Sequence, residues 1–309
     1  MRRSVRLFLI FGLFAVLLLS AAGCALRQSQ EPPVIPVVIE PSGARVAYLG
    51  PEGTYTQEAC LRFFGDGAVT DAYETVDLAV QALSDGNADY AVIPQENTIG
   101  GAVTEYVDIL ISSDGISVVG EIELPISQNL LALPGTELSD IKTVYSHRQG
   151  LVQGRQWLIE NLPDAELVVV SSTAEGARIV SEKADPSCAA VASAGCAEVY
   201  SLEILASGIQ ENDLNVTRFY VLSVAAPATA EADRLLFVAS GNAQALPELM
   251  SGIDSMGITL VSIHDRPEKT GLGQYLYIIE LSGCSYKEYL SLADDAAFEF
   301  RYLGSFSVR

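Results

Sequence analysis

Hydroxyl and amide side chains gather at five places along this 309-residue chain, next to apolar segments typical of strands. The clusters are residues 50–56 (GPEGTYT), 95–101 (QENTIGG), 146–153 (SHRQGLVQ), 171–177 (SSTAEGA) and 215–219 (NVTRF). In an open α/β sheet, ligands bind beyond the carboxyl ends of the strands, where helices begin. Converging helix starts offer N–H and hydroxyl donors that suit carboxylates, so the clusters predict a pocket for a small anion. For any single Ser or Thr, helix capping alone is an alternative explanation.

The apolar segments that must position these clusters alternate between strand-like and helical patterns. Strands are expected at 44–50, 89–94, 142–146, 166–171 and 188–193, and helices at 75–86, 101–113, 151–162 and 173–182. Strand and helix in alternation predict an α/β fold with largely parallel sheets. The strands are continuous apolar blocks, which indicates sheets covered on both faces.

A small-residue, acidic stretch at 225–233 (AAPATAEAD) is expected to be a linker. Beyond it, the order strand, helix, strand, strand, helix, with a last strand at 302–308, predicts a ferredoxin-like α+β module.

The chain is strongly acidic, with a formal net charge of −21 and a pI of about 4.3. Such a charge repels phosphate backbones and argues against nucleic-acid partners. An anionic substrate would need local positive potential from a few Arg residues and helix N-termini. No dinucleotide-binding glycine motif, P-loop or nucleophile elbow is present, and His147 and His264 have no evident third metal ligand.

The N-terminal segment is typical of an export signal and is not expected to belong to the fold. A basic start (MRRSVR) is followed by an uncharged apolar run and by AAGC, which resembles a bacterial lipobox ending at Cys24. We expect lipidation of Cys24, a signal over 1–24 and a tether over 25–43; an uncleaved membrane anchor is the alternative. The chain would then face the periplasm or the cell exterior. The other four cysteines are expected to be buried thiols, and Cys188 and Cys196 are the pair closest in sequence.

The order and wording of the clusters resemble the prephenate dehydratase family. The matching segments are GPEGTYT (50–56), PQENT (94–98), YSHRQ (145–149) with Gln153, STA (172–174), AAVAS (189–193) and NVTRF (215–219). The resemblance implies a two-lobed, periplasmic-binding-protein-like catalytic domain over 44–224 and a regulatory ACT domain over 233–309. Within it, the apolar tail of the last motif (YVL, 220–222) is expected to close the second lobe as a core strand.

The resemblance also implies an activity and the residues that carry it. The family reaction is decarboxylative dehydration of prephenate to phenylpyruvate in phenylalanine biosynthesis, a carbon–oxygen lyase reaction that needs no cofactor or metal because aromatisation drives it. Thr217, Glu96 and Asn97 are implied as catalytic, with Thr217 hydrogen-bonded to the departing hydroxyl. The implied substrate contacts are Thr98, Ser146, Gln153, Thr173, Arg218 and Phe219. Purely structural alternatives stay open: a structural ion pair for Arg218, a core position for Phe219, and a carboxylate near a helix N-terminus for Glu96.

The C-terminal module resembles ACT domains that bind phenylalanine and dimerise through their sheets. This implies a homodimer and effector contacts from Ala245, Leu246, Asp265, Arg266 and Pro267. Two positions depart from the family's effector signatures, namely Gln244 in place of Gly and His264 in place of Glu. Arogenate is a second possible substrate. A non-catalytic solute-binding lipoprotein for an aromatic acid or amino acid is the alternative function.

Overall fold

The computed structural model describes residues 43–224, 232–294 and 297–309, without the side chains of residues 104 and 105. The expected signal segment 1–24 with Cys24, the tether before residue 43, and most of the expected linker at 225–233 lie outside the described residues. No helix in the described part of the chain is long and apolar enough to cross a membrane.

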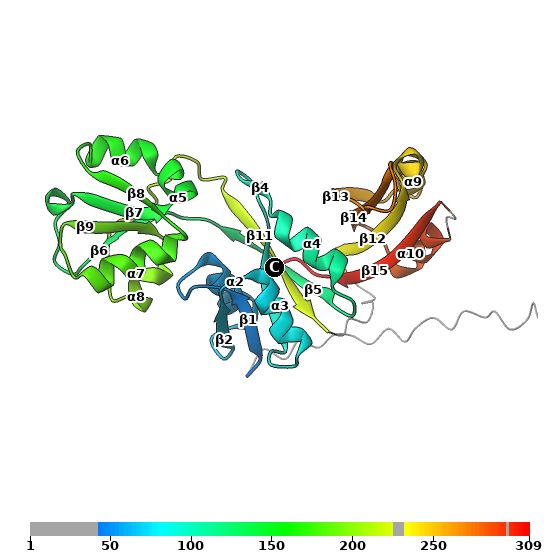
Figure 1. Cartoon of the computed structure of the whole chain (residues 1–309), viewed down its shortest axis with the longest axis horizontal. Helices are drawn as coiled ribbons and strands as arrows, with labels where there is room; N and C mark the ends of the chain where they lie inside the picture. Colours follow the sequence, from blue (N-terminus) through cyan, green and yellow to red (C-terminus); the bar gives the residue numbers. More distant parts are fainter. Residues whose placement is uncertain (1–42, 225–231, 295–296) are drawn as a thin grey trace, which may run out of the picture. The chain divides into compact units, whose positions relative to one another are not determined.

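The first lobe is built on a mixed sheet in the order β2-β1-β3-β11-β5, with the short β4 beside β3 (Figure 1). Its strands are β1 (Arg45–Leu49), β2 (Val69–Tyr73), β3 (Tyr90–Asn97), β4 (Gly101–Ala102), β5 (Ser117–Pro125) and β11 (Val216–Ser223). Strands β1, β2 and β3 are parallel, whereas β11 runs antiparallel to both of its neighbours. The expectation that residues 220–222 close the second lobe is therefore wrong, because the chain returns to the first sheet before β11 forms.

Helices cover both faces of this sheet. They are α2 (Tyr55–Phe64), α3 (Val76–Ser84) and α4 (Thr104–Ser112). Alternation along β1 sends Val46 and Tyr48 into the core under α2, and sends Ala47 into the core under α3 and α4. Burial on both faces is as the apolar blocks predict.

The second lobe carries a sheet in the order β10-β6-β9-β7-β8. Its elements are β6 (Asn129–Ala132), η1 (Leu138–Asp140), β7 (Thr143–His147), α5 (Arg148–Gln153), α6 (Arg155–Asn161), β8 (Glu166–Val170), α7 (Thr173–Lys183), β9 (Cys188–Ala192), α8 (Gly195–Val199) and β10 (Glu203–Ala206). Only β7, β8 and β9 are parallel to a neighbour, so the expectation of largely parallel sheets holds for three strands in each lobe. The single helix expected at 151–162 is two helices that meet at Gly154.

The C-terminal module has the ferredoxin-like order that the sequence predicts. Its elements are β12 (Arg234–Asn242), η2 (Ala243–Ala245), α9 (Leu246–Ser255), β13 (Thr259–Pro267), β14 (Gln274–Ser282), α10 (Tyr286–Ala293) and β15 (Phe298–Phe306). The sheet order is β13-β14-β12-β15, and every pairing is antiparallel. One face packs against α9 and α10 through residues such as Phe237 and Leu249.

The other face of the module's sheet packs on the first lobe. Leu236 and Ile278 share a core cluster with Tyr106 and Leu110 of α4. The chain end continues along β5, where the Glu121 N–H donates to the Ser307 carbonyl (3.1 Å). The module is thereby joined directly to the sheet that contains β11.

The four cysteines that the structure describes, Cys60, Cys188, Cys196 and Cys284, are buried free thiols, as expected. Burial raises the pKa of Cys196 to about 11, which keeps this thiol protonated near neutral pH.

Candidate active site

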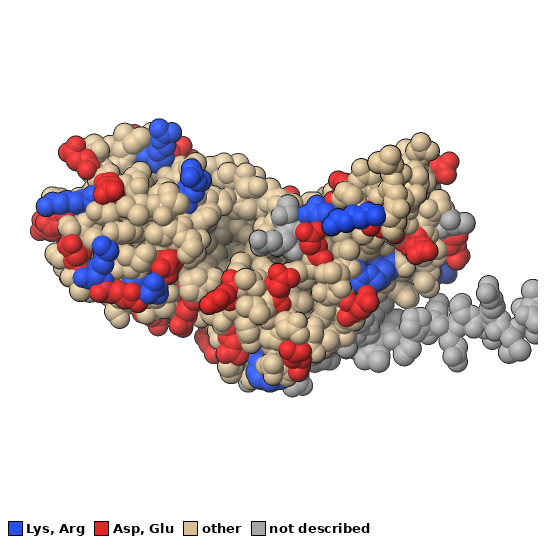
Figure 2. Space-filling model, in the orientation of Figure 1, with Lys and Arg blue, Asp and Glu red and all other residues tan. Residues whose placement is uncertain are grey.

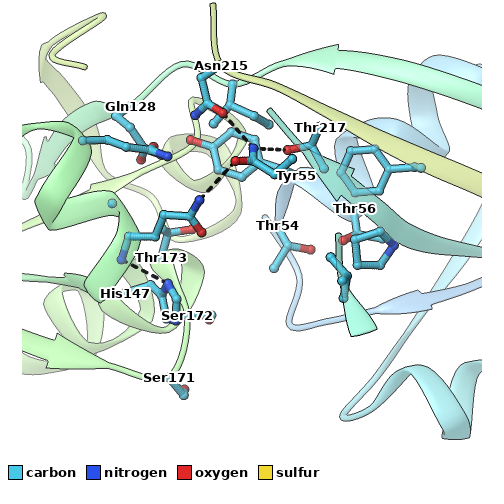
Figure 3. Close-up of a pocket in the computed structure, with 18 residues that line it drawn as sticks. Thr54, Tyr55, Thr56, Gln128, His147, Ser171, Ser172, Thr173, Asn215 and Thr217 are labelled. Carbon is cyan, nitrogen blue, oxygen red and sulfur yellow. Dashed lines mark hydrogen bonds between the residues drawn. The ribbon is translucent and has the colours of Figure 1, made fainter. Parts of the chain in front are cut away.

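A pocket of about 300 Å³ lies between the two lobes (Figure 3). All five polar clusters contribute to it, and GPEGTYT does so through its last three residues. It is lined by Thr54, Tyr55, Thr56, Pro94, Asn97, Val103, Ile126, Gln128, His147, Gln149, Gly150, Gln153, Ser171, Ser172, Thr173, Asn215, Thr217 and Phe219. The clusters thus converge as the sequence predicts, at the ends of strands from both lobes.

Helix starts form much of the pocket wall. Thr54 caps α2 by accepting from the Gln57 N–H, and Ser172 caps α7 by accepting from the Glu175 N–H (3.0 Å). His147 caps the short α5 through Nδ1, which accepts from the Gln149 N–H (3.3 Å). The same side chains therefore cap helices and line the pocket. The positive ends of α2 and α7 face the space where an anion would lie.

Asn97 is the centre of the hydrogen-bond network in the pocket. Its Oδ1 accepts from the backbone N–H groups of Ile99 (3.0 Å) and Gly100 (2.8 Å), and from Gln149 Nε2 (3.2 Å). Since backbone N–H groups can only donate, they identify the oxygen end of this amide. The amide nitrogen must then point the other way, where it donates to Asn215 Oδ1 (2.7 Å) and Thr217 Oγ1 (2.9 Å).

This arrangement sets the direction of the Thr217 hydroxyl. Because Thr217 Oγ1 accepts from Asn97, its own proton is available to a ligand in the pocket. Thr217 is therefore oriented as a hydrogen-bond donor toward the pocket, because its oxygen already accepts from the uncharged Asn97 amide.

Two buried amides in the pocket wall have an atom without a partner. Gln128 Nε2 donates to Gln153 Oε1 (2.8 Å), while Gln128 Oε1 has no partner among the described residues. Asn215 Oδ1 accepts from Asn97, and its Nδ2 is likewise unpaired within the described chain. An unsatisfied buried polar atom costs free energy, so both atoms are natural ligand contacts, one as acceptor and one as donor.

The pocket is polar but carries little charge. Among the described residues that line it, there is no Lys, Arg, Asp or Glu. On the face shown in Figure 2, the Lys, Arg, Asp and Glu side chains that the structure describes lie around the hollow between the lobes and not in it. The expected contribution of Arg residues to anion binding is therefore not seen, and the helix starts and neutral donors are left to provide it.

The strand pair β3–β11 separates the implied site residues into two groups. Asn97, Thr217 and Phe219 face the pocket, together with Gln153 and Thr173 from the second lobe. Glu96 and Arg218 do not line it, because side chains alternate along a strand. Arg218 instead forms ion pairs with Glu96 (3.3 Å) and with the buried Glu121 and Glu280, so the ion-pair alternative describes its position.

Two further implied contacts hold backbone instead of lining the pocket. The Thr98 hydroxyl donates to the Leu214 carbonyl (2.9 Å) and accepts from the Val216 N–H (3.0 Å), which ties down the chain that enters β11. The Ser146 hydroxyl is buried and donates to the Val191 carbonyl (2.6 Å), linking β7 to β9. Thr98 and Ser146 therefore stabilise the backbone around the pocket without lining it.

Sequence reasoning did not single out Gln128, Tyr55 or Asn215 as site residues. Gln128 and Asn215 lie in the two segments that cross between the lobes, after β5 and before β11. Gln128 belongs to no quoted motif, so no sequence signal marks it. Asn215 is the first residue of NVTRF, and its place in that motif was a usable signal.

The implied effector residues lie at one end of the module's sheet. Ala245 and Leu246 follow the end of β12, and Asp265 to Pro267 end β13. Arg266 reaches the first lobe, where its Nε lies 2.7 Å from Asp108 Oδ1.

Fold and site together define a two-lobed α/β protein with a pocket between its lobes that suits a small anionic ligand. Residues 46–227 match the sequence model of the family described as prephenate dehydratase. The chain belongs to the prephenate dehydratase family.

Named relatives and solved structures agree with this assignment. The chain is 37% identical over 240 residues to the bifunctional chorismate mutase/prephenate dehydratase of Neisseria gonorrhoeae, covering 77% of this chain and 66% of that protein. It spans about two thirds of the length of such bifunctional relatives. A prephenate dehydratase from Arthrobacter aurescens, solved in complex with L-Phe, superposes with a TM-score of 0.77 at 31% identity, covering 85% of this chain and 89% of that one.

A second similar structure is described as a novel type of quorum quenching acylase. It superposes with a TM-score of 0.78 at 25% identity, over 86% of this chain and 98% of that one. Because one fold hosts several chemistries, the activity must be argued from the site.

Proposed function

We propose that the protein is a prephenate dehydratase, a carbon–oxygen lyase that converts prephenate to phenylpyruvate, carbon dioxide and water. The observation that carries this proposal is the Asn97–Thr217 pair, which presents a hydroxyl proton to a pocket otherwise built for an anion. Acyl transfer, by contrast, needs a nucleophile next to a base. In the described chain, His147 Nδ1 accepts from the Gln149 N–H and not from a hydroxyl.

The reaction needs positioning more than proton-transfer machinery. The carbon–carbon bond to the ring carboxylate breaks, its electron pair enters the ring, and the ring hydroxyl leaves with one proton as water. Thr217 would donate a hydrogen bond to the departing oxygen, where negative charge develops in the transition state. A Thr hydroxyl is a weak acid, so the proton that completes the water comes from solvent or through a relay.

The remaining pocket groups are suited to the two carboxylates and the side chain of the substrate. The unpaired Asn215 Nδ2 and the starts of α2 and α7 offer donors to the carboxylates. Gln128 lies on the opposite side of the pocket from Thr217 in Figure 3. The hydroxyl and the side chain of prephenate are on opposite ring carbons, so Gln128 would face the side chain. Its unpaired acceptor suits the ammonium group of arogenate, which is therefore the second substrate to assay.

The test uses purified protein without residues 1–24, mixed with prephenate, with phenylpyruvate formation followed at alkaline pH. Wild type should turn over. Thr217→Ala should lower kcat on the order of 10²–10⁴-fold, because a positioned donor contributes about that much. Thr217→Ser, which keeps the hydroxyl, is the matched control and should stay active. Binding of prephenate without turnover by wild type would instead support the solute-binding function.

We also propose that the chain is an exported lipoprotein tethered through Cys24. The basic start, the apolar run and AAGC support this. Cys24→Ser should abolish lipid labelling and release the protein from the membrane fraction; unchanged labelling would contradict the proposal.

The C-terminal module is proposed to act as an ACT domain that forms a homodimer. Its ferredoxin-like sheet and the shared position of Ala245, Leu246 and residues 265–267 support this. Light scattering and calorimetric titration with phenylalanine test dimerisation and effector binding separately.

A further inference from the structure

A cluster of charged side chains lies on the opposite face of the β3–β11 pair from the pocket. We call it the interface charge cluster; it consists of Glu96, Glu121, Arg218, Arg234 and Glu280. Three members, Glu96, Glu121 and Arg218, lie on strands of the first lobe. The other two, Arg234 and Glu280, come from β12 and β14 of the C-terminal module. The cluster therefore joins the module to the strand that carries Thr217.

The centre of the cluster is closely hydrogen-bonded and buried, whereas Glu96 and Arg234 are partly exposed. Arg218 donates two hydrogen bonds to Glu121, from Nε to Oε1 and from Nη2 to Oε2, both 2.7 Å long. Its Nη2 also donates to Glu280 Oε1 (2.6 Å). The side chains of Glu121 and Glu280 are fully buried, and that of Arg218 is 14% exposed. Buried pairs of this kind fix geometry strictly, since any movement leaves a desolvated charge without a partner.

Glu280 is held from its own side as well. Its Oε2 accepts from the Tyr220 hydroxyl (3.0 Å) and from the Ser262 hydroxyl (3.1 Å), and Arg234 Nε lies 3.2 Å from its Oε1. The carboxylate is thus a fixed point for Arg218 and not a freely rotating surface group.

The pairing of β11 with β3 is irregular next to the cluster. The side-chain bonds of the cluster can therefore stabilise β11 at this point. The pairing of β11 with β3 shifts register between Arg218 and Phe219, where Glu96 and Pro94 are the partners and Gln95 is the additional residue. Pro94, the partner of Phe219 in this ladder, has no N–H to donate. The bulge interrupts the ladder to β3, whereas the pairing of β11 with β5 stays regular at these residues. The side-chain bonds of the cluster therefore reinforce β11 on the side where its backbone pairing is interrupted.

We propose that Glu280 is a positioning residue for the reaction, acting through Arg218 on Thr217. Thr217 and Arg218 are consecutive, so a guanidinium that is fixed on one face of β11 fixes the hydroxyl on the other face. The C-terminal module would then help to position Thr217, irrespective of any ligand that the module binds. This inference rests on the proposed dehydratase activity.

The experiment compares Glu280→Gln with Asp108→Asn in the full mature chain. Both substitutions neutralise one carboxylate that pairs with an arginine across the same interface, but Asp108 is exposed and bonds Arg266, away from β11. Glu280→Gln should lower kcat about 10- to 100-fold with KM nearly unchanged, because misplacing a catalytic group by about 1 Å costs this much and Thr217 acts chiefly in the transition state. Asp108→Asn should leave kcat and KM near wild type.

A double mutant separates positioning from general stability. In a Thr217→Ala background, single-turnover rates should show little further loss from Glu280→Gln, because the group it positions is gone. An equal loss in both backgrounds would overturn the inference, as would wild-type kcat in Glu280→Gln or an equal loss in Asp108→Asn.

Two milder variants cover the case in which Glu280→Gln does not fold. Ser262→Ala and Tyr220→Phe each remove one hydrogen bond to Glu280 and leave the charges paired. Each should lower kcat severalfold in folded protein, and wild-type kcat in both would overturn the inference. If wild type itself does not turn over prephenate, the proposed function has failed; if wild type is active and these variants match it, the positioning role alone has failed.

Discussion

The donor character of Thr217 depends on a neighbouring side chain, that of Asn97. Three donors hold Asn97 Oδ1, which leaves its amide nitrogen facing Thr217. Thr217 must then accept from Asn97 and donate elsewhere. Preorganisation of this kind stabilises charge in the transition state without reorientation during the reaction.

Asn97→Asp tests this polarity with almost no change of shape. The substitution replaces the amide nitrogen with a carboxylate oxygen, which can only accept, so the Thr217 hydroxyl would donate to this carboxylate and not to the substrate. We expect kcat to fall on the order of 10²-fold in steady-state assays, similar to the loss of an oxyanion-hole donor.

The control is Asn212→Asp, which adds the same charge to an exposed turn and keeps the acceptor for the Leu214 N–H. It should retain wild-type kinetics. An Asn97→Asp enzyme with wild-type kcat would show that the direction of this hydroxyl is irrelevant.

At the scale of elements, the pocket depends on how closely α7 lies on the second sheet. Gly176 in α7 packs directly on β7, where a Cβ atom would stand 2.8 Å from the Tyr145 carbonyl oxygen. The first turn of α7 brings Ser172 and Thr173 to the pocket. The small size of Gly176 therefore helps to set the position of two lining side chains.

Gly176→Ala should push α7 away from β7. We expect a loss of about 1–3 kcal/mol in the free energy of unfolding, the usual cost of overpacking against groups that cannot yield. Prephenate KM should rise because Ser172 and Thr173 move with the helix. Denaturant unfolding and steady-state kinetics measure the two effects.

Gly252→Ala in α9 is the matched control, since it is also a helical glycine. The nearest atom to its added Cβ would be Leu292 Cδ2 at 3.7 Å, an ordinary contact. This variant should be as stable as wild type or more stable by up to about 1 kcal/mol. Equal stability of wild type and Gly176→Ala would contradict the close-packing argument.

At the scale of the whole molecule, the C-terminal module and the first lobe share a buried polar interface. His264 of β13 lies there with its ring edge-on to Tyr106 of α4, the centroids 5.8 Å apart, and its Nε2 has no hydrogen-bond partner in the described chain. Burial lowers the pKa of His264, with further lowering from Arg266 and Arg218 and opposing effects of Glu96 and Glu280. The folded interface therefore prefers the neutral imidazole.

This preference makes stability depend on pH in a predictable direction. The unfolded chain takes up the His264 proton at a higher pH than the folded chain does, so stability falls as pH drops from about 7 through the ordinary histidine pKa toward the folded value. We expect the unfolding midpoint of wild type to decline between about pH 7.5 and 5.5. His264→Gln should show a shallower decline, and an unchanged slope would contradict the assignment to His264.

The sequence alone determined much of this protein, because its signals are local. Apolar blocks and N-cap residues such as Thr54 and Ser172 depend on neighbours a few positions away, so the elements and the convergence of the clusters were predictable. The ferredoxin-like order of the module was predictable for the same reason. The prephenate dehydratase motifs add the family, which the comparisons show.

The tertiary structure decided which face each side chain occupies and what crosses between the lobes. NVTRF puts Thr217 and Arg218 side by side in sequence, yet alternation along β11 sends one to the pocket and the other to Glu280, 62 residues away. Gln128 enters the site only because β5 is followed by a crossover. Such contacts join segments far apart in the chain, and no local pattern records them, since pairing and register depend on the packing of the whole sheet.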